Sequence, residues 1–185
     1  MTDGVFAAPD LHRLMFGLLY PAVLGTFFFS LLPVLFGTGS DKIERPSTTK
    51  TLTGCLVVLH FIVDFHLASS LPPKEYSLGG FILDLLILGF LFRAFNALNI
   101  CWSHEPLSVR GAATAIAMTY GLFLVWSFLT LEVTLERLPL WTAEAAGLIV
   151  FIIVRSSKSI SFLCWSLIIF SSIMAVLGSM AVGSL

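Results

Sequence analysis

The chain has 185 residues, of which 57% are hydrophobic and only 11% are charged, and its formal net charge is −1. Soluble globular domains carry charge on about a quarter of their residues, so this chain lacks the charges to cover a water-facing surface. The small net charge argues against a nucleic-acid partner, because nucleic-acid binding requires a basic patch. The composition predicts an all-α, polytopic integral membrane protein that forms one transmembrane helical domain over residues 1–185.

The N-terminal segment lacks the features of a cleaved signal peptide. Largely polar residues, including Asp3 and Asp10, precede the first apolar run, and that run exceeds the ~7–15 residues of a signal-peptide core. We therefore expect a retained first helix. Cys55, Cys101 and Cys164 lie in or beside apolar runs and are interpreted as free thiols and not as a disulfide framework.

Six apolar segments predict a bundle of about six transmembrane helices, since a span needs ~20 mostly apolar residues. Pro21 lies inside the first segment, where a proline bends a helix, and Pro72 and Pro73 end the second. The polar linker 37–51 is too short to form a domain. In chain order the expected helices cover residues 11–36, 52–71, 79–102, 111–135, 140–154 and 159–185.

Basic residues favour the cytoplasmic side of a membrane, and they are unevenly divided between the two sides of this chain. With six helices, Arg13, Lys74 and Arg137 fall on the side of the N-terminus. Six others fall on the opposite side: Lys42, Arg45, Lys50, Arg110, Arg155 and Lys158. We expect both termini on the non-cytoplasmic side of a plasma or inner membrane.

Small residues recur every four positions on several helices, a spacing that lets helix backbones approach closely in lipid. Packing within one subunit and self-association into a homo-oligomer, or assembly with another membrane protein, are both open interpretations. The longest such series lies on the last helix and consists of Ser171, Ala175, Ser179 and Gly183.

The second helix carries His60, Asp64 and His66 near its centre. Ionisable groups at this depth cost ~2.5–3.5 kcal/mol each on insertion scales, so they are rare and commonly functional. His60 and Asp64 are four residues apart and share one helix face. His66 faces elsewhere, so we expect this helix to contact neighbours on both sides.

Further polar residues on other helices extend this pattern. The third helix contains Asp84 toward its outer end, Arg93 slightly inward of the midplane, and then two asparagines. Carboxylates and imidazoles can pass on a proton or replace the water of a cation. The pattern predicts a transporter or channel subunit for protons or small cations, whose path is lined by His60, Asp64, His66, Asp84, Arg93, Asn96, Asn99 and Glu144.

Three alternatives stay open. Arg93 can pair with Asp64 in a structural ion pair, which would favour a non-catalytic membrane subunit or effector that acts by assembly. His60, Asp64 and an acid from another helix can hold Zn²⁺ or Cu²⁺, since imidazole and carboxylate suit these ions. His60 and Asp64 can also serve as the acid–base pair of an intramembrane enzyme that acts on a lipid-soluble substrate.

The enzyme alternative is supported by a resemblance to a known family. His60, Asp64 and Phe65 resemble the helix of intramembrane sterol isomerases of the emopamil-binding type, which place a histidine and a carboxylate four residues apart, followed by an aromatic. Residues 119–121 and 128–132 are similar to a later segment of that family. The chain has Asp64 where the family has Glu, and the family's final-helix asparagine and tryptophan pattern is not evident. The resemblance implies protonation of an alkene by a carboxylic acid.

The sequence predicts no cofactor. No lysine lies in a membrane helix, so a retinal Schiff base has no attachment point. Both intramembrane histidines lie on one helix, so a haem held between two helices lacks a second axial histidine. The phosphate-binding Gly-x-x-x-x-Gly-Lys loop and the Gly-x-Ser-x-Gly nucleophile elbow are absent from the sequence.

Overall fold

The computed structural model describes residues 8–36, 48–70, 76–99, 107–130 and 137–183, which form helices and turns and contain no strand. The first three helices follow one another without a break and make one continuous span. The elements are α1 (Ala8–Leu14), the π-helix η1 (Met15–Leu19), α2 (Tyr20–Phe36), α3 (Thr48–Ser70), α4 (Leu78–Asn96), α5 (Val109–Thr130), α6 (Leu138–Ser157) and α7 (Ile160–Gly183).

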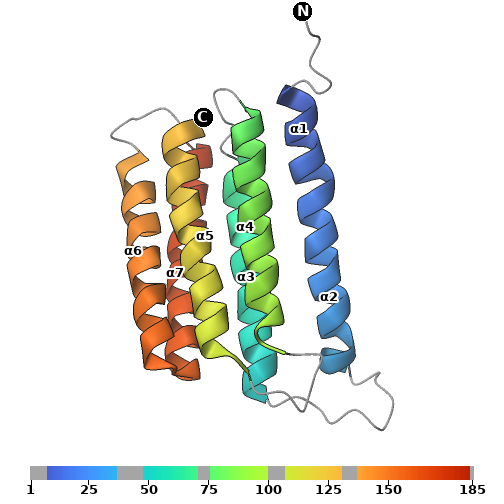
Figure 1. Ribbon diagram of the computed structural model, residues 1–185, viewed down its shortest axis with the longest axis vertical. Helices are drawn as coiled ribbons and strands as arrows, with labels where there is room; N and C mark the ends of the chain where they lie inside the picture. The colour runs from blue at the N-terminus through green and yellow to red at the C-terminus, as the bar shows by residue number, and fades with distance from the viewer. Residues whose placement is uncertain (1–7, 37–47, 71–75, 100–106, 131–136, 184–185) are drawn as a thin grey trace, which may run out of the picture.

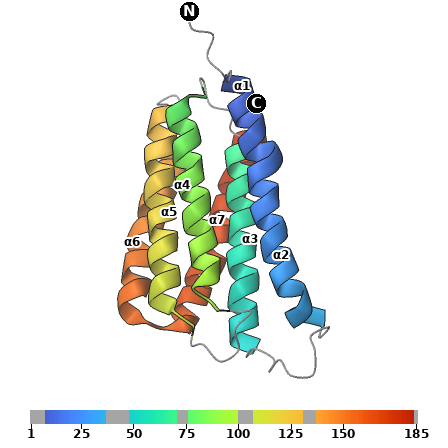
Figure 2. The ribbon, with the colours of Figure 1, turned by 45° about the vertical axis from the view of Figure 1, so that its right-hand side comes forward.

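Six helices of the described chain are long and apolar enough to cross a membrane, which confirms the all-helical fold and the expected number of candidate spans. α4, α5 and α6 form one layer, α3 and α7 lie behind it, and the first span lies against α3 and α4 (Figures 1 and 2). α3 packs mainly against α7 and also against α2. The helix that carries His60 and Asp64 therefore has neighbours on both sides, as expected.

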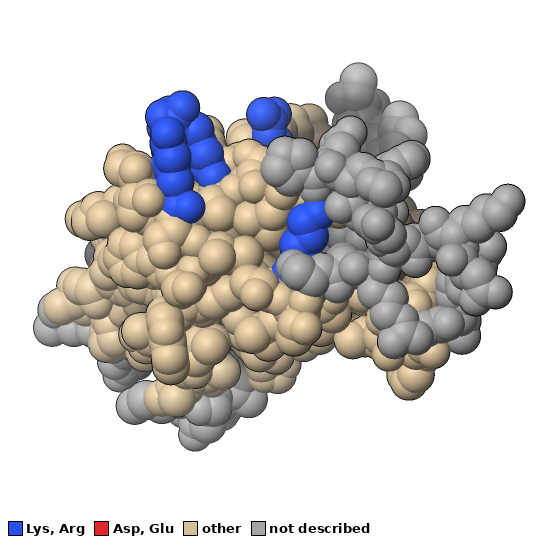
Figure 3. Space-filling view, turned by 90° about the horizontal axis from the view of Figure 1, so that it is seen from below, with Lys and Arg blue, Asp and Glu red and all other residues tan. Residues whose placement is uncertain are grey.

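The two ends of the bundle differ in charge. α1 begins and α7 ends at the upper end in Figure 1. Figure 3 looks at the lower end and shows Lys and Arg side chains with no Asp or Glu among the described residues there. The helix bounds place five described basic residues near this end: Lys50, Arg93, Arg110, Arg155 and Lys158.

The outer surface of the bundle is strongly apolar. Phe29 is 76% exposed, Phe36 and Leu129 are each 72% exposed, and Trp165 is 65% exposed. A soluble monomer rarely exposes contiguous apolar patches larger than a few hundred Å². These exposed side chains are consistent with a multi-pass membrane protein.

The first span contains a π-helical turn just before Pro21. Proline has no backbone N–H, so the carbonyl four residues earlier lacks its usual donor. The chain widens here, and the N–H of Tyr20 donates to the carbonyl of Met15, five residues before it. The sequence predicted a bend at Pro21, and the structure places a π-helix at this point, a feature found often at functional sites.

α4 is shorter than the sequence predicted. It ends at Asn96, whereas we expected the third helix to continue to residue 102. Asn99 has a φ of 49°, a left-handed conformation that asparagine tolerates and a helix does not. The N–H of Ser108 then donates to the carbonyl of Ala97 at 2.9 Å and leads the chain into α5. Residues 131–135, the expected end of the fourth helix, lie outside the described residues.

Several of the small residues pack within this chain. A Cβ atom at Gly147 would lie 2.6 Å from atoms of the Tyr120 ring, so glycine is what lets α5 and α6 approach. On α7, Ser171 is buried while Ala175 is exposed. The side chains of Ser179 and Gly183 lie outside the described part, and self-association through this helix stays a prediction.

Candidate functional site

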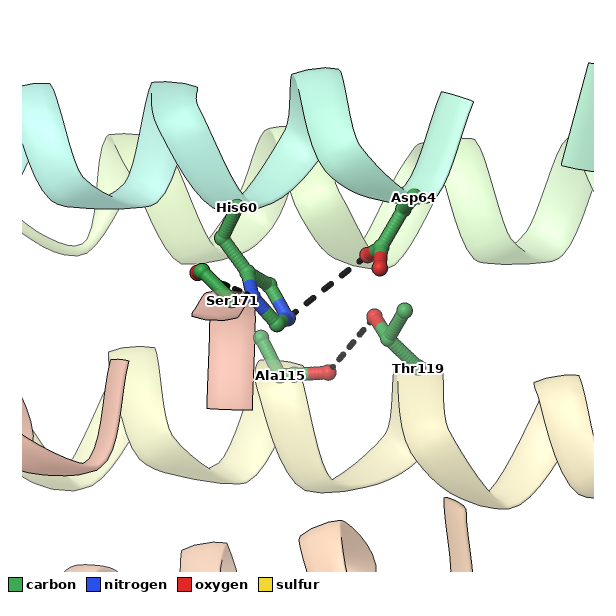
Figure 4. A network of polar contacts seen from close by, with 5 residues as sticks. All are labelled: His60, Asp64, Ala115, Thr119 and Ser171. Carbon is green, nitrogen blue, oxygen red and sulfur yellow. Dashed lines mark hydrogen bonds and ion pairs between the residues drawn. The ribbon is translucent and has the colours of Figure 1, made fainter. Parts of the chain in front are cut away.

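His60 and Asp64 form a buried pair on α3. Each is 1% exposed, and Nε2 of His60 lies 3.6 Å from Oδ2 of Asp64 (Figure 4). The pairing follows from helix geometry, because residues four apart lie one above the other on the same face. Neither of the two facing atoms has a hydrogen-bond partner among the described residues, so the pair can gain or lose a proton without first breaking another bond.

The other ring nitrogen of His60 is held from α7. Nδ1 lies 2.9 Å from Oγ of Ser171, and both side chains are buried. This contact orients the imidazole and leaves Nε2 directed at Asp64 (Figure 4). When Nδ1 carries the hydrogen and donates it to Ser171, Nε2 is a free base that faces the carboxyl group.

Aromatic side chains from α5, α6 and α7 surround the pair. The ring of Tyr120 lies 5.5 Å and that of Phe151 6.3 Å from the ring of His60, measured between centroids. Phe170 contacts both of these rings. Thr119, on α5, lies opposite Asp64 (Figure 4), and the Thr119 hydroxyl donates to the carbonyl of Ala115 at 3.1 Å. The surroundings are therefore largely apolar, which strengthens electrostatic interactions within the site.

Two more carboxyl groups are buried at a similar level of the bundle. Asp84 is 0% and Glu144 is 1% exposed. Asp64 precedes the end of α3 at Ser70 by six residues, and the other two follow the starts of α4 at Leu78 and α6 at Leu138 by six. At 1.5 Å per residue this places all three about 9 Å below the upper ends of their helices. The sequence had placed Asp84 nearer the surface than Asp64.

Each of these two carboxyl groups has its own hydroxyl partner. Tyr76 donates a hydrogen bond to Oδ2 of Asp84, and burial, together with this bond, raises the pKa of the Tyr76 phenol. The hydroxyl of Ser127 on α5 lies 2.7 Å and 3.0 Å from the two carboxyl oxygens of Glu144 on α6.

No lysine or arginine among the described residues is buried. Arg93 is exposed in the last turn of α4, at the lower end, whereas Asp64 lies toward the upper end of α3. The alternative in which Arg93 pairs with Asp64 is therefore not what the structure shows. The physical reason is the difference in level: Arg93 follows the start of α4 at Leu78 by fifteen residues and therefore lies about 14 Å further from the upper end than Asp64 does.

The remaining residues of the expected path do not join the buried group. His66 and Asn96 are exposed, and Asn99 is half-buried in the turn after α4. The structure brings together His60 and Asp64, places Asp84 and Glu144 at the same level, and leaves the other four candidates outside this layer. The described residues contain no group of three or more His, Cys, Asp or Glu side chains that could hold a metal ion, so they give no support to the metal alternative.

Sequence reasoning missed the hydroxyl partners. Ser171 had been noted only as a small residue, and Tyr76 and Ser127 had not been singled out. Each of these three residues is distant in sequence from its partner or lies beyond a helix end. The helical spacing of residues in the sequence therefore gives no indication of the contact. Comparison of the chain with protein-family models, with curated proteins and with solved structures finds no match.

Proposed function

We propose that the chain is an integral membrane protein that crosses the bilayer six times. The support is the six long apolar helices together with the exposed aromatic and aliphatic side chains on the outside of the bundle. Basic residues favour the cytoplasmic face, and they gather at the lower end. The lower end then faces the cytoplasm of a plasma or inner membrane, and the start of α1 and the end of α7 face the other side.

We further propose that the protein transports protons or small cations. The observation that carries this proposal is the layer of three buried carboxyl groups, Asp64, Asp84 and Glu144, without a buried lysine or arginine among the described residues. An unpaired carboxylate in a low-dielectric interior costs several kcal/mol. Such a group is stable only with a bound proton or a bound cation, which makes the layer a binding site for one of these.

The His60–Asp64 pair is the centre of the proposed mechanism. A proton on Asp64 moves to Nε2 of His60 when the 3.6 Å gap closes, which leaves a carboxylate beside an imidazolium. Opposite charges this close stabilise each other. The pair can therefore hold the proton in two places, and release from His60 returns the carboxylate to a state that binds the next proton.

The test is ion flux across liposomes that contain the purified protein. We expect the wild-type protein to move protons down an imposed gradient, reported by an internal pH-sensitive dye, and Asp64→Asn to return flux to the level of protein-free liposomes. Asp10→Asn makes the same chemical change at an exposed position in α1 and should leave flux unchanged. A wild-type protein that conducts nothing under gradients of H⁺, Na⁺, K⁺ or divalent ions would exclude this function.

The same flux assay compares the contributions of Asp64 and Asp84 to transport. We expect Asp64→Asn to reduce flux more than Asp84→Asn. The two lie at a similar level, so the reason is not depth. Asp64 faces an imidazole that can accept its proton, whereas the Oδ2 atom of Asp84 is occupied by Tyr76. An equal or larger loss in Asp84→Asn would contradict this assignment.

One observation favours the intramembrane isomerase as a second candidate. The two segments that carried the resemblance meet in space, since Thr119 and Tyr120 on α5 lie across from His60 and Asp64. An isomerase of this kind adds one proton to an alkene and removes another. It would therefore incorporate deuterium from D₂O into a lipid-soluble alkene, in a manner that depends on Asp64, and would show no ion flux.

A further inference from the structure

Tyr20 occupies the junction between the first span and the acid-bearing helices. Its side chain is 0% exposed. Its ring lies 5.4 Å from that of Phe61 and 5.5 Å from that of Phe65, the two aromatic residues that flank Asp64 on α3. The Tyr20 hydroxyl has no hydrogen-bond partner among the described residues. A buried, unsatisfied hydroxyl costs about 1–3 kcal/mol, so a hydroxyl that is kept here without a partner is a candidate for a functional role.

The same span also contacts the Tyr76–Asp84 pair. The ring of Phe16 stacks on that of Tyr20 at 5.3 Å, and the ring of His12 meets the edge of Tyr76 at 5.2 Å. His12, Phe16 and Tyr20 thus form one aromatic line along the span. The line begins at Tyr76, the hydroxyl partner of Asp84, and ends at Phe61 and Phe65, which lie three residues before and one residue after Asp64.

Three buried oxygen atoms around this junction lack partners in the described chain: the Tyr20 hydroxyl, Oδ2 of Asp64 and Oδ1 of Asp84. The titratable groups on the elements packed against the first span include Asp64 on α3, Asp84 on α4 and Tyr76 before α4, with His12 further along the span itself. None of them is a permanent cation.

We propose that the Tyr20 hydroxyl relays protons between Asp84 and Asp64, and that this junction is one route from the upper end of the bundle to the His60–Asp64 pair. The relay rests on the proposed transport function and specifies the proton as its substrate. In one step the Tyr20 hydroxyl accepts a proton that leaves Asp84 and gives its own proton to the Asp64 carboxylate. Asp84 becomes a carboxylate, Asp64 becomes a carboxylic acid, and Tyr20 ends unchanged.

The step requires movement of these side chains or intervening water, since none of the three atoms is hydrogen-bonded to another in the structure. The phenol suits this role because it can donate and accept at the same oxygen. Phenylalanine at position 20 would keep the ring contacts with Phe16, Phe61 and Phe65 and would remove only the oxygen.

The experiment compares Tyr20→Phe with wild type in two measurements on the purified full-length protein. In the liposome assay we expect Tyr20→Phe to lose about as much proton flux as Asp84→Asn does, and less than Asp64→Asn does, while its thermal unfolding midpoint does not fall. The matched control is Thr26→Val, which removes a hydroxyl from the exposed side of the same span, where it bonds only to the carbonyl of Ala22. This control should conduct as wild type does.

The second measurement is the infrared carbonyl stretch of protonated carboxyl groups, assigned by its loss in Asp64→Asn and in Asp84→Asn. We expect Tyr20→Phe to shift the bands of both groups and Thr26→Val to shift neither. If wild type conducts protons and Tyr20→Phe conducts equally well, the relay is wrong and the transport function stands. If wild type conducts nothing, the transport function fails, and unchanged carboxyl bands would then overturn the contact between Tyr20 and the acids as well.

Discussion

The hydroxyl of Ser171 lies 2.9 Å from Nδ1 of His60, although 111 residues separate them in the chain. This contact joins α3 to α7 at the middle of the bundle and is the only described hydrogen bond to the imidazole. It decides which nitrogen of His60 faces Asp64, so the orientation of the proposed proton acceptor depends on the last helix.

Removal of this hydroxyl should destabilise the bundle. We expect Ser171→Ala to lower the free energy of unfolding by about 1–3 kcal/mol, because Nδ1 of His60 would be buried without a partner. Unfolding in detergent would measure the change. Ser172→Ala is the matched control, since Ser172 is exposed and bonds only to the carbonyl of Ile168. Equal effects at the two positions would contradict the importance of the His60 contact.

Gly147 should not tolerate a methyl group. Alanine here would place Cβ 2.6 Å from the Tyr120 ring, and overpacking of this kind costs about 1–3 kcal/mol. Tyr120 contacts His60, so proton flux should also fall. Gly89→Ala provides the comparison, because a Cβ on this exposed glycine meets nothing within 4 Å. A stable, fully active Gly147→Ala protein would show that α5 and α6 can separate without consequence.

Tyr76→Phe should reduce stability in a pH-dependent manner. At neutral pH we expect a loss of about 1–3 kcal/mol, because a buried oxygen of Asp84 loses its donor. The raised pKa of Tyr76 means that the folded protein keeps the phenol proton where the unfolded chain, with a pKa of about 10, releases it. This contribution is complete below pH 10 and is lost as the pH rises further.

The measurement is the free energy of unfolding between pH 7 and pH 11 for wild type and Tyr76→Phe. The wild-type curve should fall more steeply than the variant curve above pH 10, since only wild type has this proton to lose. Parallel curves would mean that the phenol is free to ionise in the folded protein.

The orientation can be tested with single cysteines in a chain whose own three cysteines are replaced by alanine. We expect a membrane-impermeant maleimide to label Leu138→Cys from outside intact cells and to label Ser157→Cys only after the membrane is opened. The two exposed positions begin and end α6. The reverse pattern would place the basic end outside and would contradict the proposed orientation.

The fold could be predicted largely from the sequence, because long apolar runs in lipid have few alternatives to the helix. Helix ends were less predictable. A left-handed turn at Asn99 ends the helical segment early, and hydropathy cannot reveal such a turn. Arg93 lies exposed in the last turn of this shorter helix, whereas the sequence places it only slightly inward of the midplane, where pairing with Asp64 is an open alternative.

Of the candidate site, only the pair formed within one helix, His60 and Asp64, could be predicted from the sequence. His60 and Asp64 share a face because of helix periodicity, and their spacing was sufficient to pair them. Ser171 and Ser127 reach their partners through tertiary packing of α7 and α5. No spacing rule links them to His60 or Glu144, and many other serines in the chain have the same local surroundings.

The π-helix η1 sets the rotational register of the first span. A π-turn holds one residue more than an α-turn, so deletion of a single residue in this segment, such as the exposed Leu18, would restore an ordinary α-helix. Everything before the deletion would turn by about 100° relative to α2, the angle of one helical residue. His12 would leave Tyr76 while Phe27 stayed in the core. The extra residue in η1 therefore lets His12 face Tyr76 while Phe27, on the same span, faces the core.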